Sequence, residues 1–254
     1  MERRVSDILN QATCAFYAGQ AESFSQTRRS AWPGWLCCLG YLDGLGARVR
    51  LLDLACGNLR FESFLERERP AVEWSIEALD SCADLFSSAQ DLASPVRFRE
   101  LDLVSALLDG DGRFGLDCSL FVDACVSFGF FHHVPGFETR VHALSCLLGQ
   151  LRPGGIAMVS LWQFAKSPEL LARAQAATQR GASALDLCPG DLEPGDYLMG
   201  WRDEGDVFRY CHSFAPEEID ELLAAVSDSA ELVERFEADG RTGDLNTYLV
   251  LRRR

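Results

Sequence analysis

Residues 49–60 read Val49-Arg50-Leu51-Leu52-Asp53-Leu54-Ala55-Cys56-Gly57-Asn58-Leu59-Arg60. A short apolar run ends near an acid, passes through a turn of small residues and continues into a helical pattern that reaches Glu68. This order is typical of a buried strand that leads into a helix. We therefore predict a strand over 49–55 and a helix over 60–68.

The same alternation continues to residue 162. It predicts further strands over 72–79, 96–101, 120–127 and 156–162, and helices over 81–89 and 137–151, the second closed by the breaker Arg152-Pro153-Gly154-Gly155. Such alternation indicates a mostly parallel sheet with helices on both faces. The chain then changes pattern, with a helix over 216–227 and a hairpin of extended runs over 230–238 and 245–251. The predicted fold class is α/β, a Rossmann-like seven-stranded sheet that ends in an antiparallel hairpin.

The chain has 254 residues, which favours a single domain over 1–254. Two segments fall outside the alternation. Residues 1–47 are predicted to form a helical cap of two helices, separated near Ser30 to Gly34. Residues 183–206 carry seven acids and one arginine with several Gly and Pro, so they are predicted to form a loop. A functional lid and an ordinary solvated loop both remain open.

Composition narrows the function classes. The net charge is −14, the wrong sign for a protein that grips nucleic acid through a broad basic surface. Ten cysteines without a CxxC pair indicate reduced core residues. The sequence starts without a signal-peptide pattern and contains no apolar run of membrane-spanning length. We expect a cytoplasmic protein with no membrane partner.

The turn at Gly57 points to a particular kind of ligand. Open α/β sheets bind ligands at the carboxyl ends of their strands. A dinucleotide site needs the glycines of GxGxxG so that backbone amides can reach a pyrophosphate, and this turn has one glycine. The charge of Asp53 disfavours a pyrophosphate but suits an ammonium group. S-adenosylmethionine (SAM), which has an amino group and a sulfonium but no phosphate, fits better.

This turn resembles motif I of class I SAM-dependent methyltransferases, an acid followed by GxGxG. Ala55 and Leu59 replace the first and third glycines, and Leu59 is expected to narrow the cofactor pocket. Asp80 ends the second strand, where a carboxylate can accept both ribose hydroxyls. The resemblance implies that Asp102, after the third strand, contacts the adenine amino group, although either acid alone could be a helix cap. The predicted cofactor residues are Asp53, Ala55, Gly57, Asn58, Arg60, Asp80, Ser81, Asp102 and Leu103.

Further segments resemble the tRNA wobble-uridine carboxymethyl methyltransferases and their bacterial relatives. They are Tyr17 to Arg28 with Trp32-Pro33, Phe131-His132-His133-Val134 with Arg140, Gly195 to Trp201, and Phe208-Arg209-Tyr210-Cys211-His212-Ser213-Phe214. The family's string usually reads Arg-Tyr-Tyr-His, and Cys211 departs from it. The resemblance implies methylation of a carboxylate on a modified tRNA wobble uridine or on a similar anionic acceptor. Because the eukaryotic members work with a small zinc-binding activator subunit, such a partner is a candidate here.

The candidate catalytic residues are His132, His133, Arg28, Arg209 and Tyr210. Arginine suits an anionic acceptor because its guanidinium binds a carboxylate or phosphate through two parallel hydrogen bonds. A carboxylate acceptor needs no general base, whereas an amine or hydroxyl acceptor would need His132 or His133. The two histidines could instead fix a loop, and no third residue with metal-ligand spacing accompanies them, so no metal is predicted. Two alternatives remain, a methyltransferase for a small acidic metabolite and a non-catalytic binding protein of the same fold.

Overall fold

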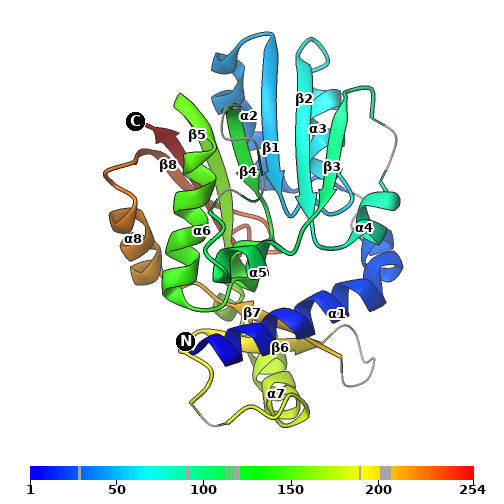
Figure 1. Cartoon of the computed structure of the whole chain (residues 1–254), viewed down its shortest axis with the longest axis vertical. Helices are drawn as coiled ribbons and strands as arrows, with labels where there is room; N and C mark the ends of the chain where they lie inside the picture. The colour runs from blue at the N-terminus through cyan, green and yellow to red at the C-terminus, as the bar shows by residue number, and fades with distance from the viewer. Residues whose placement is uncertain are drawn as a thin grey trace.

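The computed structural model describes residues 1–27, 30–89, 92–112, 114, 116, 121–188, 190–200 and 207–254. In these ranges the centre is a seven-stranded sheet in the order β3-β2-β1-β4-β5-β9-β8 (Figure 1). The strands are β1 (Arg48–Leu54), β2 (Glu73–Asp80), β3 (Val96–Glu100), β4 (Val122–Ser127), β5 (Leu151–Trp162), β8 (Ala230–Ala238) and β9 (Asn246–Arg253). Strands β1 to β5 are parallel, and β9 is antiparallel to both β5 and β8. The predicted fold class, with its closing hairpin, is confirmed.

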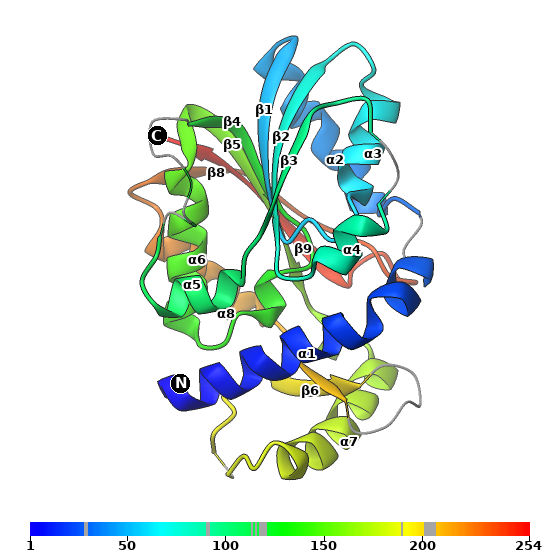
Figure 2. The same cartoon turned by 45° about the vertical axis from the view of Figure 1, so that its right-hand side comes forward.

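Helices cover both faces of the sheet because successive strand residues point to opposite sides (Figure 2). From β1, Leu52 and Leu54 belong to the core that also includes residues of α5, α6 and α8. Val49 and Leu51 belong to the core under α2 and α3. The helices are α2 (Pro33–Leu42), α3 (Arg60–Glu68), α4 (Ala83–Ser87), α5 (Leu103–Leu108), α6 (Phe137–Gly149) and α8 (Pro216–Ala225). Packing in these two cores holds the parallel strands in place, so that their carboxyl ends lie together at one edge of the sheet.

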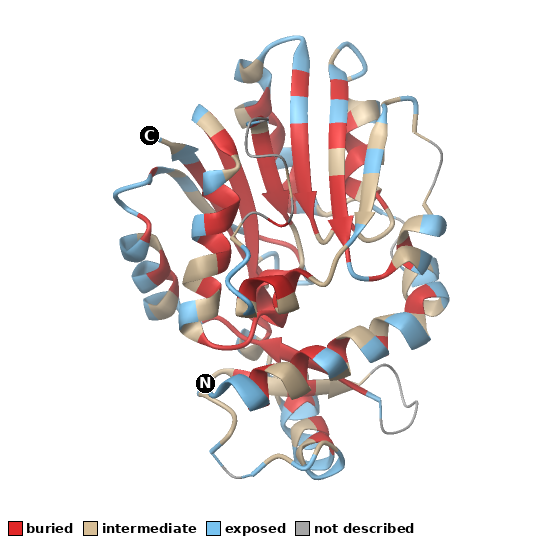
Figure 3. Cartoon of the chain, viewed as in Figure 1, coloured by how far each residue is buried: buried red, intermediate tan, exposed pale blue. Residues whose placement is uncertain are grey.

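A further layer lies beyond that edge, below the arrowheads of β1 and β2 in Figure 1. It consists of α1 (Arg3–Thr27), the helix α7 (Pro168–Ala184) and a two-stranded sheet of β6 (Asp196–Gly200) and β7 (Phe208–His212). Helix α1 packs against β7, where the Tyr210 amide donates to Oγ1 of Thr13 at 3.0 Å. Figure 3 shows that α1 buries one side and exposes the other. The first 47 residues therefore do form two helices, but only α1 covers this edge, whereas α2 packs on a face of the sheet.

The structure differs from the sequence prediction between residues 163 and 206. Helix α7 was not predicted, because its buried face consists of small residues, Ala174, Ala177 and Gly181, which give a weak apolar pattern. Strand β6 lies within the segment predicted to be a loop and pairs with β7. Outside this region, the short helix α5 was also not predicted. Of the expected loop, residues 189 and 201–206 lie outside the described ranges.

The sequence Arg152-Pro153-Gly154-Gly155 was predicted to separate the preceding helix from a strand that begins at residue 156. In the structure it lies inside β5. Strand β5 begins at Leu151, and its register with β4 shifts between Val122 and Ala124, which marks a bulge. A Cβ on Gly155 would lie 2.9 Å from the Arg152 carbonyl oxygen and 3.0 Å from that of Asp123, so only glycine fits there without a shift of the backbone. Proline and glycine in a strand are typical of such bulges. Among the described helices, none combines the length and apolarity needed to cross a membrane.

Candidate functional site

A cavity of about 370 Å³ lies at the carboxyl edge of the parallel strands and is bounded on one side by α1. Most of the predicted site residues line it: Asp53, Ala55, Gly57, Asn58, Arg60, Asp80, Ser81, Asp102, Leu103, His132, His133 and Arg209. Arg28 lies outside the described residues. Tyr210 is fully buried and is not among the lining residues. The structure therefore brings most of the predicted residues together at one cavity, and it adds α1 side chains that were not predicted as site residues, Asn10, Thr13, Cys14, Tyr17 and Phe24.

The turn after β1 has left-handed backbone at every second residue. The φ angles are 64° at Ala55, 55° at Gly57 and 55° at Leu59. These are the three positions at which motif I carries glycine, the residue that adopts this conformation without strain. Leu59 is 3% exposed, packs in the core under α2 and α3 and does not line the cavity. The expectation that Leu59 narrows the pocket is therefore wrong, because its side chain points into the core.

Asp80 holds in place the turn over residues 55–59, which we call the cofactor loop. Its Oδ2 accepts a hydrogen bond from the Gly57 amide at 2.8 Å, and its Oδ1 accepts one from the Cys82 amide at 2.9 Å. Burial raises the pKa of this carboxyl group, and the backbone hydrogen bonds from Gly57, Cys82 and Ser81 oppose that rise. A carboxylate has roughly four acceptor positions, so one remains beside these three backbone donors. Asp80 can thus fix the loop and still accept a ligand hydroxyl.

Asp102 joins the third strand region to α1. Its Oδ1 caps α5 by accepting from the Ser105 amide at 3.0 Å. Its Oδ2 accepts from Nδ2 of Asn10 at 2.7 Å. The helix-cap interpretation of Asp102 is therefore correct, and the same carboxylate also lines the cavity. Any ligand amino group at Asp102 has to share it with Asn10.

Arg60 connects the cofactor loop to the start of α2. Its NH1 donates to the Ser30 carbonyl at 2.9 Å, and its guanidinium lies 5.5 Å and 5.3 Å from the ring centres of Trp32 and Trp35. Trp35 is 2% exposed and stacks on Trp32 at 5.4 Å. The two tryptophans thus pack against each other and against Arg60, and both also border the cavity.

Arg209 places a buried cation on the opposite wall. It is 6% exposed, and its guanidinium lies 4.8 Å from the ring centre of Phe16 and 5.8 Å from that of Tyr17. Burial opposes its charge, but Tyr17 and Cys211 favour it, and the net effect is a raised pKa. The guanidinium therefore remains charged at any physiological pH. It lines the same cavity as the cofactor loop.

His133 is neutral and has a defined tautomer. Burial and, to a smaller extent, the nearby Arg209 cation lower its pKa to about 3, against the opposing effect of the hydrogen bond to the Tyr210 carbonyl. Its Nδ1 lies 2.6 Å from the Tyr210 carbonyl oxygen, which can only accept, so Nδ1 carries the hydrogen. Nε2 must then accept, and the Tyr17 hydroxyl donates to it at 2.9 Å. A histidine with this pKa is a weak base at pH 7.

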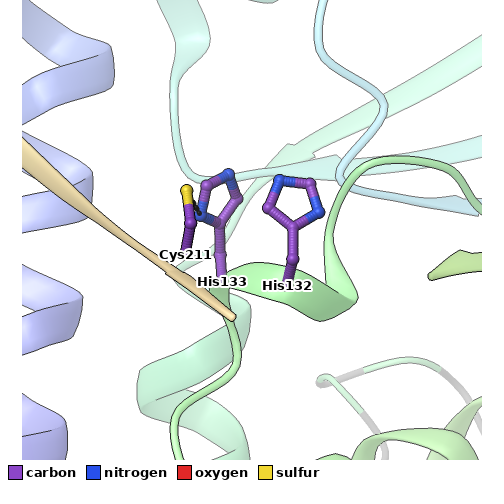
Figure 4. A group of neighbouring side chains, drawn as sticks. All are labelled: His132, His133 and Cys211. Carbon is purple, nitrogen blue, oxygen red and sulfur yellow. Dashed lines mark hydrogen bonds between the residues drawn. The ribbon is translucent and has the colours of Figure 1, made fainter. Parts of the chain in front are cut away.

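His132, His133 and Cys211 form a group of potential metal ligands, with ligand atoms within 4.8 Å of one another (Figure 4). Cys211, the third member of this group, was not predicted from the sequence as a possible ligand. The Nδ1 of His133 that lies 3.9 Å from the Cys211 sulfur already donates to the Tyr210 carbonyl. Arg209 adds a positive charge beside both His133 and Cys211. Because the Arg209 cation would repel a bound metal ion, these three residues are better described as a hydrogen-bonded cluster than as a divalent metal site.

A buried polar network behind this wall holds β7 in place. Tyr210 Oη donates to Oδ1 of Asp196 at 2.6 Å, and His212 lies 2.6 Å from both Oδ1 of Asp196 and Oε2 of Glu218. Arg140 pairs with Glu218 at 2.9 Å rather than with a neighbour on its own helix. Burial disfavours the charge of His212, but the two carboxylates raise its pKa. The prediction that the Tyr210 side chain acts in catalysis is not supported, since its hydroxyl belongs to this network.

No family model matches the chain. It is 31% identical over 147 residues to tRNA (carboxymethyluridine(34)-5-O)-methyltransferase ALKBH8 of Mus musculus, which covers 56% of this chain and 18% of that protein. The chain thus matches less than a fifth of this relative's length.

Solved structures share the fold at low sequence identity. The Burkholderia thailandensis 1,6-didemethyltoxoflavin-N1-methyltransferase, solved with its acceptor and S-adenosylhomocysteine (SAH), superposes with a TM-score of 0.60 at 16% identity, over 94% of this chain and 86% of that one. A SAM-dependent methyltransferase of Methanosarcina mazei gives 0.57 at 15%, over 84% and 96%. At this identity the likeness establishes the fold.

Proposed function

We propose that this chain, whose fold is that of the class I SAM-dependent methyltransferases, transfers a methyl group from SAM to a carboxylate. The observation that carries the proposal is the buried guanidinium of Arg209, which lines the same cavity as the cofactor loop. In a pocket that excludes water, a guanidinium binds a carboxylate through short charge-assisted hydrogen bonds. A charged acceptor and the cofactor would thus share one cavity.

The residues at the sheet edge fit SAM. Asp53 offers a buried carboxyl group beside the loop, suited to an ammonium group, and Asp80 can accept ribose hydroxyls. A Cβ on Gly57 would meet no atom within 4 Å, so the chain itself does not fill the space beside this turn. We therefore propose that the cofactor site consists of Asp53, Ala55, Gly57, Asn58, Arg60, Asp80, Ser81, Asp102 and Leu103.

Bound SAM supplies an electrophilic methyl group. A carboxylic acid with a pKa near ~4 is already ionised at neutral pH, so the protein does not have to remove a proton from it. The low pKa of His133 agrees with this, because His133 cannot serve as an effective base. The role of Arg209, positioned by the rings of Phe16 and Tyr17, is to hold and orient the acceptor, and orientation supplies most of the rate.

The named relative suggests one specific acceptor, the carboxymethyl group of uridine 34 in tRNA. With a net charge of −14, the protein would have to hold the tRNA through local contacts or through a partner such as a small activator subunit. The same net charge favours a second candidate, a small acidic metabolite that enters the cavity without a phosphate backbone to repel.

Arg209 variants test the proposal. Arg209→Ala should leave SAH affinity nearly unchanged and lower kcat/KM for the true acceptor at least tenfold, equivalent to ~1.4 kcal/mol. Arg209→Lys should restore little, since lysine cannot form two parallel hydrogen bonds. Arg97→Ala, on an exposed arginine of β3 paired with Glu77, is the matched control. Acceptors to compare are tRNA that carries carboxymethyluridine, with and without an activator subunit, and a panel of small carboxylic acids.

The outcomes separate the candidates. Methylation of the tRNA supports the first acceptor, and methylation of a small acid supports the second. Loss of SAH binding in Arg209→Ala, or unchanged turnover, would mean that Arg209 is structural. If the wild-type protein does not bind SAM or SAH in calorimetry, the chain is a non-catalytic binding protein. Mass spectrometry of modified nucleosides and metabolites from a deletion strain identifies the acceptor independently.

A further inference from the structure

Two buried carboxyl groups lie behind the cofactor loop. Asp53 stands near the end of β1 and is 3% exposed, and Glu62, in the first turn of α3, is fully buried. In the described part of the chain, Oδ1 of Asp53 and both carboxyl oxygens of Glu62 have no hydrogen-bond partner outside the pair itself. Asp53 lines the cavity, and Glu62 does not. An ionised carboxylate in such a place is unfavourable unless a cation or a proton accompanies it.

Among the described residues, no basic side chain acts on the pKa of Asp53 or Glu62. The titratable groups that face the pair are Asp80 from β2, Cys56 from the loop and Cys125 from β4. Burial raises the pKa of Asp53, and the nearby Glu62 and Asp80 raise it further. Burial also raises the pKa of Glu62, but hydrogen bonds with Asp53 and with the backbone amide of Glu62 itself partly offset that rise. Glu62 lies in the first turn of α3, where the helix dipole favours a negative charge, so Glu62 is the better site for the charge and Asp53 for the proton.

We propose that Asp53 and Glu62 form a proton-exchange site for the cationic end of the cofactor. In the free protein the pair shares one proton, held mainly on Asp53. When the ammonium group of the methionine part binds against Asp53, this proton leaves to the solvent and the ammonium group replaces its charge. No covalent bond changes, and the net charge of the pair with its cation stays the same. This inference rests on the proposed function, and it assigns a role to Glu62 that motif I alone does not suggest.

The exchange makes cofactor binding depend on pH. Because a proton is released, the affinity for SAM or SAH should rise with pH, by up to tenfold per unit while the free pair still holds its proton. A ligand that lacks the amino-acid part, such as 5′-methylthioadenosine, has no ammonium group and should bind without releasing a proton. Glu62→Gln removes the neighbour that helps Asp53 retain its proton, so it should reduce the release.

Calorimetry in two buffers of different ionisation enthalpy measures the number of protons released at one pH. We expect close to one proton per SAH for the wild type, none for 5′-methylthioadenosine, and clearly fewer for Glu62→Gln. Glu68→Gln, a partly exposed acid on the same helix, is the matched control and should behave as the wild type. As a second readout without ligand, Glu62→Gln should unfold at higher urea concentration than the wild type at pH 8, since it removes a buried acid.

The results distinguish this inference from the proposed function. SAH binding with no linked proton, or equal release by 5′-methylthioadenosine, would overturn the exchange while leaving the methyltransferase proposal intact. Absence of SAH binding in a folded wild-type protein would overturn both. If Glu62→Gln fails to fold, the comparison of SAH with 5′-methylthioadenosine on the wild type alone still decides the question.

Discussion

Replacing Leu59 with glycine should destabilise the protein, although glycine is the residue that its backbone conformation favours. Leu59 has a left-handed backbone with φ at 55°, which is strained for a residue with a side chain. Relief of this strain by glycine should raise the free energy of unfolding by roughly 1–2 kcal/mol. Its side chain is 3% exposed, and shortening a buried leucine to alanine costs roughly 3–5 kcal/mol. The lost packing exceeds the relieved strain, so we expect a net loss of about 2 kcal/mol. For a chain of this length, that lowers Tm by roughly 4–8 °C.

Urea unfolding followed by circular dichroism measures this loss, and calorimetry with SAH shows whether the cavity survives. Ala55→Gly is the matched control, because Ala55 has φ at 64° but is only partly buried. There the relief of strain outweighs the loss of one methyl group, and we expect stability to stay equal or to rise by up to about 1 kcal/mol. Equal or higher stability of Leu59→Gly would refute the conclusion that Leu59 is held in the core. A large gain in SAH affinity would instead show that its side chain reaches the cavity.

Two further predictions concern polar contacts. Asp80→Asn should weaken SAH binding at least tenfold, because an amide cannot accept from Gly57 and Cys82 through both of its terminal atoms, and unchanged affinity in calorimetry would contradict the role of Asp80. His212 is stabilised as a cation between Asp196 and Glu218, so its contribution is complete below the ordinary pKa of ~6.5 and is lost as pH rises through the raised value. The free energy of unfolding of the wild type should therefore fall in that window, whereas that of His212→Gln should not, and equal slopes would rule out this source.

The large sheet was predictable because each of its strands carries its own apolar run and ends in a recognisable turn. The carboxyl ends of parallel strands necessarily meet at one edge, so Asp53, Asp80 and Asp102 could be placed together from their positions alone. The elements that were missed are those with weak local signals, such as α7, whose buried face consists of alanine and glycine. The Arg152 to Gly155 segment misled the prediction because proline and glycine mark a bulge as well as a turn.

The acceptor side of the cavity could not be predicted to the same degree. Arg209 was identified from a resemblance, but its packing against Phe16 and Tyr17 joins segments far apart in the chain. The burial of Tyr210 follows from its pairing with Asp196 in β6, a strand that was not predicted. Glu62 did leave a local signal, since it lies between Phe61, Phe64 and Leu65 on the buried face of α3. An acid within an apolar face indicates either a strained position or a functional one.

The contact between α1 and β7 has a consequence for how the protein is made. The hydrogen bond from Tyr210 to Thr13 joins residues 197 positions apart. During synthesis the apolar side of α1, with Val5, Leu9 and Phe16, leaves the ribosome long before the strand that covers it exists. The loop after β1 can take shape early, but the cavity closes only when β7 arrives. The apolar face of α1 therefore stays exposed to other proteins for most of translation. Chaperone dependence and co-translational aggregation should be most sensitive to substitutions on that face.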